Sequence, residues 1–358
     1  MKYKKDFAFV LSCFCAFVFL PACSSGLRYG REAKLIKRGY ELSARQNPKG
    51  ECNVLMLGEV WQNVRDTFYK PLSNEQIFRF ALQGLSSSVE RSVDLPEYSD
   101  KKKYGPNHFW FLIDYISQFT DKNKSELCYA SIRGIVSNLD DPYKSFYAPQ
   151  KAMRAIGWMI EPKKYSSEPA SVCKMLRDVP YCDLTIFDSR TMLSFFREFA
   201  KLPKHDKKII LDMRGSRGGL IDVACQALGA MWLGKKKAFI EVDRNGRREA
   251  KLAIPGKRLF LNNFRAVVLI NRNTYSASEI FVSAIKDYKT AILVGETTHG
   301  KGMIQRNYFP SGAVLTISIR TILSPFGNAF NGKGVAPDIY VKDKNNAPLK
   351  KALEILKN

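Results

Sequence analysis

Hydrophobic positions follow two different rhythms along the chain, and the change divides it into two parts. From Glu59 to Glu90 and from Phe109 to Asp140, apolar residues recur every three or four positions, which is the spacing of amphipathic helices. From about Tyr165 onward, short apolar runs alternate with helix-like segments, as in an α/β fold, and a hairpin is predicted around Asn245-Gly246. The pattern predicts a helical N-terminal domain over residues 51–150 and an α/β core over residues 171–358.

One strand-to-helix turn in the second part has the composition of a reactive site. The apolar run Val267 to Ile270 ends in polar residues, and Ser276 opens the helix-patterned segment Glu279 to Asp287. A serine at a helix start lies near unpaired N–H groups, which favour negative charge. A second buried strand, Ala291 to Val294, leads to Lys301. Because parallel strands around a helix bring such residues together, Ser276 and Lys301 are a candidate nucleophile and base.

A glycine-containing turn adds a third element. Lys208 to Asp212 predicts a strand, and Gly218 and Gly219 precede another helix-patterned segment. Glycines let backbone N–H groups approach a ligand without side chains in the way, as an oxyanion hole requires. A plain tight turn is the alternative interpretation.

Two other interpretations fit the serine and lysine segments. Ser276-x-x-Glu279 is also a capping box, which satisfies backbone donors without any chemistry. The segment Gly295 to Lys301 matches the first positions of a phosphate-binding P-loop. However, Gly302 supplies no hydroxyl for a magnesium ion, and no helix pattern follows, so nucleotide binding is disfavoured.

Several ordered motifs resemble the C-terminal processing (tail-specific) serine proteases. The similarity extends from about Val60 to Leu356 and implies a core of strand–strand–helix units related to the crotonase fold. The segment Leu139 to Pro149 resembles the signature that closes the helical region of that family. The motifs of the core that carry the resemblance are Leu211 to Leu220, Ser276 to Glu279, Val294 to Gln305 and Gly332 to Ile339.

The resemblance implies a role for each matching residue. Ser276 would be the nucleophile, Lys301 the general base and Gln305 the residue that orients the lysine. A lysine accepts the serine proton only if burial lowers its pKa. Gln305 follows Lys301 at an even offset, which predicts one face of a strand for both. Ser278 is the alternative nucleophile if the register is shifted. The implied oxyanion-hole N–H groups are those of Gly218, Gly219 and Ala277.

Two residues beside the predicted site depart from the family pattern. His299 stands where an aromatic residue is usual, and Tyr275 where a small one is common. They either alter the specificity pocket or are tolerated beside a retained site. His108, His205 and His299 stand in no triad motif, and no metal-type Cys/His spacing occurs. We therefore expect neither a cofactor nor a metal.

Proteases of this family commonly carry a peptide-binding PDZ domain between the signature and the core. Residues 151–170 are too few for such a domain and predict a short connector. In the family that domain binds the C-terminal carboxylate of the substrate. We therefore expect selection of protein or peptide substrates by residues around the cleaved bond, or by a separate adaptor protein.

The N-terminus resembles a bacterial lipoprotein signal. Basic residues precede the apolar stretch Phe7 to Leu20, which is too short to span a bilayer. The sequence Leu-Pro-Ala-Cys begins at the end of this stretch, at Leu20. Residues 1–22 are the predicted signal peptide, Cys23 the lipid attachment site and residues 23–50 a linker. Ser24 favours the outer membrane, with the protein in the cell envelope facing the periplasm. An ordinary secretory signal is the alternative.

Charge and cysteines extend this picture of an envelope protein. The formal net charge of +23 attracts anions, and with no nucleic-acid motif an anionic lipid surface is favoured over DNA or RNA. A simply solvated lysine-rich surface is the alternative. Cys173 and Cys182 could bridge a hairpin in an oxidising compartment, although buried thiols fit equally well.

The sequence as a whole predicts a membrane-anchored serine endopeptidase that cleaves envelope or periplasmic proteins with a Ser276/Lys301 dyad. The main alternative is a catalytically silent binding or scaffold protein on the same fold. A crotonase-like acyl transferase is a third possibility, but it would not need Lys301. The complete set of serine, lysine, glutamine and paired glycines favours the enzyme.

Overall fold

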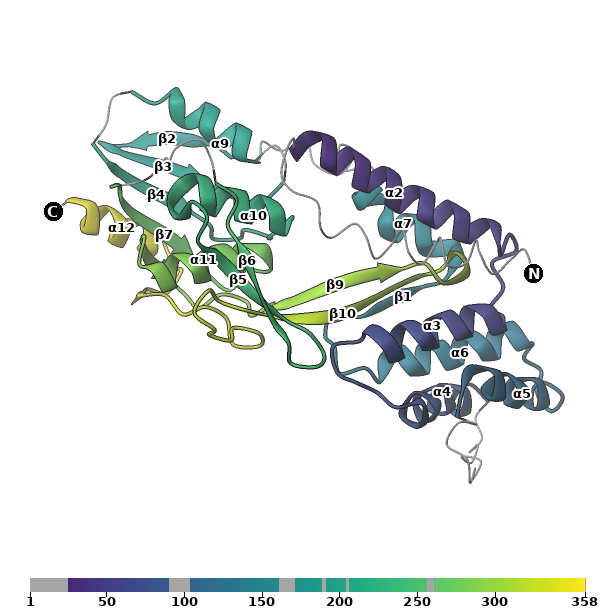
Figure 1. Cartoon of the computed structure of the whole chain (residues 1–358). Helices are drawn as coiled ribbons and strands as arrows, with labels where there is room; N and C mark the ends of the chain where they lie inside the picture. The colour runs from purple at the N-terminus through teal and green to yellow at the C-terminus, as the bar shows by residue number, and fades with distance from the viewer. Residues whose placement is uncertain are drawn as a thin grey trace.

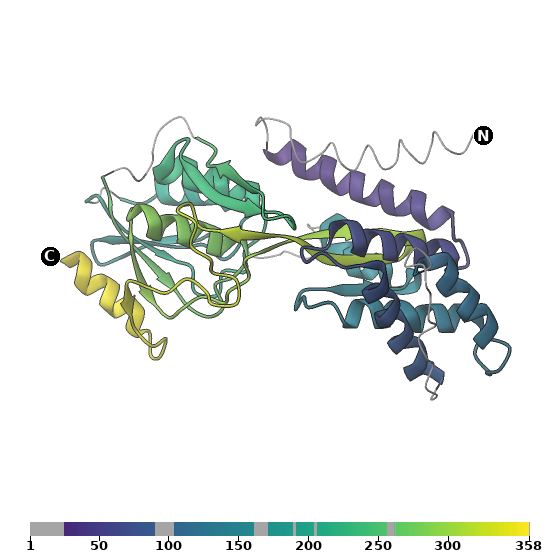
Figure 2. The same ribbon diagram turned by 60° about the horizontal axis from the view of Figure 1, so that its bottom comes forward.

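The protein consists of two lobes joined by a long two-stranded ribbon (Figures 1 and 2). The ribbon is formed by β9 (Met303–Tyr308) and β10 (Val314–Leu323), which pair antiparallel. The computed structural model describes residues 25–89, 104–160, 171–188, 191–203, 206–255, 261 and 263–357.

The α/β lobe is built on a six-stranded sheet with the order β11-β8-β7-β4-β3-β2. Neighbouring strands from β3 to β11 are parallel, and only β2 runs antiparallel to its neighbour. This mixed architecture agrees with the predicted fold class. The strands are β2 (Cys173–Leu176), β3 (Val179–Asp183), β4 (Lys208–Asp212), β7 (Arg265–Ile270), β8 (Ile292–Gly295) and β11 (Ile339–Tyr340).

Helices cover both faces of this sheet. Successive residues of a strand point to opposite faces, so Val268 packs into the cluster that includes α10 (Ile221–Leu228) and α11 (Ala277–Tyr288). Val267 instead packs on the other face against α12 (Ala347–Lys357). The helix α9 (Thr191–Ala200) lies on the same side as α10 (Figure 1). Burial on both faces explains the continuous apolar runs of the central strands.

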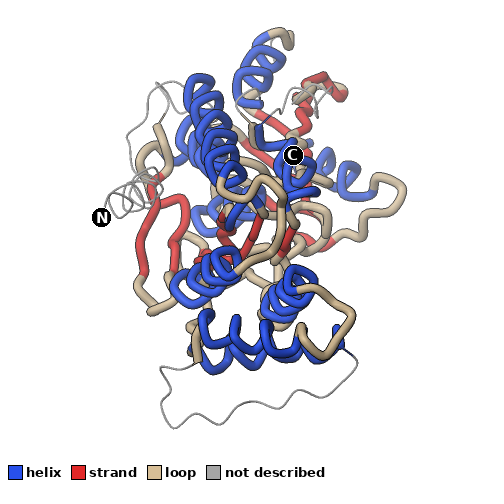
Figure 3. Tube along the Cα trace, turned by 90° about the vertical axis from the view of Figure 1, so that its right-hand side faces the viewer, coloured by secondary structure: helices blue, strands red, loops and turns tan. Residues whose placement is uncertain are grey.

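The second lobe consists mainly of the helices formed by the two long helix-patterned stretches (Figure 3). Each stretch forms two helices, because Pro71 interrupts the first and Asn123 begins a new helix in the second. The Asn123 side chain accepts from the N–H of Glu126, whose carboxylate accepts from Asn123 in return. The helices are α3 (Val54–Thr67), α4 (Asn74–Val89), α5 (Pro106–Ile116) and α6 (Lys124–Ser137).

The long strand β10 belongs to the hydrophobic cores of both lobes. Leu315 and Ile317 are buried among the helices of the N-terminal lobe, whereas Ile322 is buried in the α/β core. The strand also pairs with β1 (Ser145–Tyr147) at one end and with β5 (Lys237–Val242) at the other. A boundary drawn along the sequence near residue 150 therefore does not separate the two cores.

Two segments predicted to be connections form helices. In the segment 23–50, predicted as a linker, residues Ser25–Arg45 form α2; in the connector 151–170, residues up to Ile160 belong to α7 (Pro149–Ile160). Tyr40 of α2 packs with Ile156 of α7, and this burial stabilises both helices. Residues 161–170, and residues 1–24 with Cys23, lie outside the described residues.

The hairpin predicted at Asn245-Gly246 is confirmed. It joins β5 to β6 (Arg248–Leu252), with Gly246 at a positive φ of 79°. Cys173 and Cys182 are directly opposed on β2 and β3 and form a disulfide. A second disulfide, Cys52–Cys128, joins the start of the helical lobe to α6 and was not predicted. Within the described residues, no helix has the length and apolar character needed to cross a membrane.

The contact between α4 and α6 depends on two glycines. On α4 and α6, Gly84 and Gly134 face each other, and a Cβ atom built on Gly84 would lie 2.3 Å from the carbonyl oxygen of Ala130. Backbone atoms occupy this space, so no side-chain rotation can relieve the overlap.

We expect Gly84→Ala to destabilise the protein by at least about 2 kcal/mol, because α4 and α6 would have to separate. Gly58→Ala is the matched control, since Gly58 lies within α3 and has no atom within 4 Å of its built Cβ. The control should leave the protein up to about 1 kcal/mol more stable, because alanine favours the helix. Urea unfolding of both variants measures the difference; equal stability would contradict the contact.

Candidate active site

The turn between β7 and α11 holds Ser276 in a strained backbone conformation. Its φ of 61° and ψ of −127° lie outside the regions that a residue with a side chain normally adopts. The turn is held on one side by a hydrogen bond from the Tyr275 N–H to the Ser216 carbonyl, 3.1 Å long. Ser276 is partly exposed and directly precedes α11.

A buried carboxylate ties this turn to the segment that carries Lys301. Glu279 is completely buried, and both of its oxygens accept hydrogen bonds. One oxygen accepts from the N–H groups of Ser276 (3.0 Å) and Lys301 (2.7 Å). The other accepts from the Thr298 hydroxyl and the Gly300 N–H, both at 2.6 Å. The predicted capping box is therefore part of a larger arrangement in which one side chain positions both proposed dyad residues.

The glycine turn lies against the serine. A Cβ built on Gly218 would be 2.8 Å from the Cβ of Ser276, so only glycine permits this approach. The N–H of Gly218 is already used, because it donates to the Ser278 hydroxyl at 3.0 Å. Among the hydrogen bonds of the described residues, none uses the N–H of Gly219 or Ala277. Of the three predicted oxyanion donors, these two are available.

Ser278 has a structural position. It is completely buried, and its hydroxyl lies 2.8 Å from that of Ser216 while accepting from Gly218. A hydroxyl with these contacts cannot reach a substrate carbonyl. The geometry therefore favours Ser276 over the alternative nucleophile.

Lys301 lies under an aromatic ring from the other lobe. Its Nζ is 4.8 Å from the centre of the Tyr143 ring, and burial lowers the pKa of the lysine, although Asp141 and Glu279 partly oppose this. No hydrogen bond joins Lys301 to the Ser276 hydroxyl in the described part of the chain. Burial thus favours the neutral form of Lys301, which is the form that can accept a proton.

Gln305 does not orient the lysine as predicted. Lys301 precedes β9 and does not lie within it, so the even offset between Lys301 and Gln305 does not put the two side chains on one face of a strand. The Gln305 side chain instead donates to the carbonyl oxygen of Tyr143 at 2.5 Å. Asp141 holds the same loop by accepting from Tyr143 and from Ser318 of β10. Gln305 therefore contacts the loop that carries Tyr143, whose ring lies beside Lys301.

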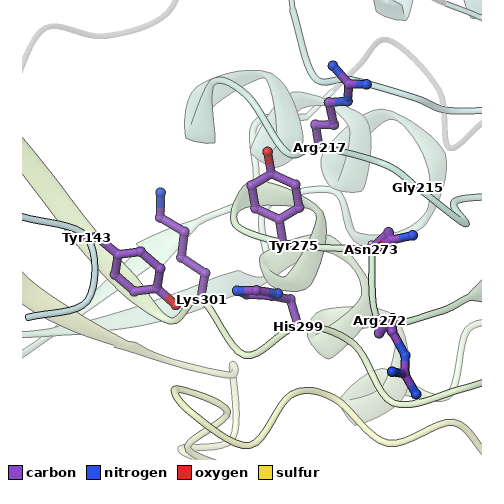
Figure 4. A pocket seen from close by; sticks show the side chains of 8 residues that line it. All are labelled: Tyr143, Gly215, Arg217, Arg272, Asn273, Tyr275, His299 and Lys301. Carbon is purple, nitrogen blue, oxygen red and sulfur yellow. The ribbon is translucent and has the colours of Figure 1, made fainter.

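Two of these residues, Tyr143 and Lys301, line a cavity of about 440 Å³ (Figure 4). Tyr143 and Lys301 lie at one end of it, and Arg217 and Arg272 lie at the other. Between them are the two residues that depart from the family pattern, Tyr275 and His299, whose rings are 5.7 Å apart. The remaining lining residues are Gly215 and Asn273. Neither Tyr143 nor the two arginines stands out in the sequence as a site residue, although Tyr143 belongs to the Leu139 to Pro149 signature.

The family comparison agrees with this geometry. Residues 178–341 match the model of peptidase family S41. A probable CtpA-like serine protease of Staphylococcus aureus (strain N315) is 31% identical over 153 residues, which are 42% of this chain and 30% of that protein. A similarly named protein of Staphylococcus saprophyticus is 30% identical over 138 residues, 38% of this chain and 28% of that protein. The chain thus matches less than a third of the length of these curated relatives.

Solved structures support the fold alone. The photosystem II D1 C-terminal processing protease superimposes with a TM-score of 0.52 at 18% identity, covering 80% of this chain and 98% of that one. A lipoprotein from Streptococcus agalactiae gives a TM-score of 0.51 at 16% identity, covering 80% and 97%. Residues 178–341 thus match peptidase family S41, and the chain is similar in fold to a C-terminal processing protease.

We expect Glu279→Gln to destabilise the protein by about 2–3 kcal/mol, because the amide nitrogen cannot accept from the two donors it would face. Glu354→Gln, at an exposed ion pair on α12, is the control and should change stability by less than about 0.5 kcal/mol. Denaturant unfolding of the two variants provides the comparison. Indistinguishable midpoints would show that the Glu279 contacts do not hold the site together.

Proposed function

We propose that the protein is a serine endopeptidase in which Ser276 and Lys301 form the catalytic dyad. The observation that carries the proposal is the shared carboxylate of Glu279, which binds the backbone N–H groups of both residues. A helix cap alone would need the contact to Ser276 but not the contacts to Gly300 and Lys301. The match of residues 178–341 to peptidase family S41 supports the same reaction.

In the proposed reaction, the Ser276 hydroxyl attacks the carbonyl carbon of a peptide bond and Lys301 accepts its proton. The N–H groups of Gly219 and Ala277 then donate to the oxygen that becomes negative in the tetrahedral intermediate. The protonated lysine returns the proton to the leaving amine. A water molecule, deprotonated by the same lysine, releases the acyl group and restores Ser276.

Lys301 lies against the Tyr143 ring, so in the proposed mechanism its amino group must move to reach the Ser276 hydroxyl. Hydrogen bonds between catalytic groups are often long without substrate and shorten in the complex. A substrate in the cavity excludes water from the lysine, which favours its neutral form. In the proposed mechanism, Lys301 therefore turns from the Tyr143 ring to Ser276 when the cavity is filled.

The proposed location is the cell envelope, with Cys23 lipidated, the protein facing the periplasm and its substrates among envelope or periplasmic proteins. Both disulfides are compatible with an oxidising compartment. The exposed side of α2, close to Cys23 in sequence, carries four basic residues, and each contributes about 1 kcal/mol near an anionic membrane. An adaptor protein remains part of the proposal as a means of delivering substrates. The four basic residues are Lys34, Lys37, Arg38 and Arg45.

We expect Ser276→Ala and Lys301→Ala each to reduce peptide hydrolysis at least about a thousandfold, with no further loss in the double variant, because the pair acts as a unit. Lys350→Ala, on the exposed side of α12, is the control and should retain activity. Steady-state hydrolysis of a protein substrate measures these effects. Full activity of Ser276→Ala would rule out this nucleophile, and an inactive wild type that still binds peptides would favour the silent scaffold.

The pH dependence tests the lysine separately. Lys301 must be neutral to accept a proton, so hydrolysis should increase as the pH rises through its pKa, which burial places below the ordinary value of lysine. Lys301→Arg keeps the positive charge but cannot lose its proton, so it should be inactive at every pH. Activity that is independent of pH in the wild type would contradict this assignment.

We expect Cys23→Ser to prevent lipid attachment, leaving the signal peptide uncleaved or the protein released from the membrane. Mass spectrometry of the N-terminal peptide and fractionation of the cells measure both effects. The disulfide-bonded Cys52 and Cys128 should be unaffected in the variant. An unmodified mature N-terminus at another residue of the wild type would exclude the lipoprotein proposal.

A further inference from the structure

The cavity beside Ser276 is cationic. Its lining residues include two arginines, Lys301 and His299, and none of its eight lining residues is an aspartate or a glutamate. The mechanism requires Lys301 to be neutral, so the lasting positive charge comes from the arginines. Charge of one sign around a cavity attracts ligands of the opposite sign.

Arg217 lies next to the proposed oxyanion hole. It precedes Gly218, the residue that packs against Ser276, and its backbone N–H is fixed by a hydrogen bond to the Thr185 carbonyl. The side chain is exposed and has no ion pair or hydrogen bond within the described residues. An arginine in this position does not stabilise the fold through its guanidinium group, which is left available for a ligand.

Arg272 approaches the cavity from the turn that carries the nucleophile. It follows β7, shortly before Ser276, and its side chain is 79% exposed. Its only acidic partner in the described part of the chain is Glu296, with a long separation of 3.7 Å. A contact of this length in water is weak and can be replaced by a substrate carboxylate.

We propose that Arg217 and Arg272 bind carboxylate groups of the substrate, so that the enzyme prefers peptides with a negative charge close to the cleaved bond. The inference rests on the proposed function. In Figure 4 both arginines lie on the side of Tyr275 and His299 that is away from Lys301, and they are well separated from each other, so each guanidinium offers a separate site at the rim of the cavity. Guanidinium groups match carboxylates with paired hydrogen bonds. The carboxylate belongs either to an acidic side chain or to the C-terminus of the substrate.

Binding to the Ser276→Ala variant tests the inference without requiring turnover. In one arm, peptides with amidated C-termini differ only by Glu or Gln at a single position, which is moved along the peptide. In the other arm, a neutral peptide carries either a free or an amidated C-terminus. Fluorescence anisotropy gives the dissociation constants at low and high salt. We expect the carboxylate form to bind about two- to fivefold more tightly per arginine at low salt, with a smaller ratio at high salt.

Arginine variants assign the effect to the cavity. Arg217→Gln and Arg272→Gln, each combined with Ser276→Ala, should lower the ratio, and the two together should bring it close to one. Arg248→Gln, on the exposed strand β6, is the matched control and should keep the full ratio. Because all three side chains are exposed, the variants should fold normally, which circular dichroism verifies.

A preference in the first arm identifies an acidic side chain as the ligand, and a preference in the second identifies the C-terminal carboxylate. Equal or undetectable binding in both arms overturns the inference, as does a preference that persists when both arginines are replaced. Hydrolysis of the same peptides by the wild type is measured in parallel. If selective binding occurs but no peptide is cleaved, the proposed function fails while the carboxylate site remains.

Discussion

The candidate site depends on one buried carboxylate. Glu279 accepts four hydrogen bonds, and they come from the turn before α11 and from the segment between β8 and β9. A buried charge is stable only when such donors surround it, so neither segment can move independently without leaving the charge unpaired. The same contacts hold Ser276 in its strained conformation, since the Ser276 N–H is one of the four donors.

The second lobe contributes to the site through β10. Ser318 of this strand binds Asp141, which in turn fixes the loop with Tyr143 over Lys301. Hydrophobic residues of β10 are buried in both cores, so the strand fixes the position of the helical lobe relative to the segment that carries Lys301. The base of the proposed dyad is therefore buried by residues from both lobes, and the lowered pKa of Lys301 is a property of their contact.

The polar residues around the nucleophile have separate tasks. Ser278 and Ser216 bind each other below the glycine turn, and Ser278 also accepts the N–H of Gly218. The N–H of Gly218 is therefore not available to an oxyanion. The same hydrogen bond fixes the turn in which, among the described residues, the N–H of Gly219 is free to donate to a substrate. The site thus uses one glycine for close approach and the other for the proposed stabilisation of charge. The exposed arginines beside this turn add a positive field that plays no part in holding the fold together.

Local patterns in the sequence were sufficient to predict the strands, helices and turns next to the site in the α/β core, because each of these elements depends on neighbouring residues. The strand before Ser276, the helix after it and the hairpin at Asn245-Gly246 all form where the pattern predicts them. Residues 25–45 form a helix where a linker is predicted, because burial against α7 stabilises this helix and no local pattern reveals that contact.

The same limit applies to the site. The order of the motifs predicts that Ser276 and Lys301 are neighbours, and both bind the Glu279 carboxylate. The side-chain contacts around them, however, involve residues that are distant in the sequence. The Gln305 side chain binds Tyr143, 162 residues away, and the N–H of Gly218 is taken by Ser278. Side-chain hydrogen bonds across such separations depend on how the lobes pack, so they follow from the tertiary structure and not from the spacing of residues along the chain.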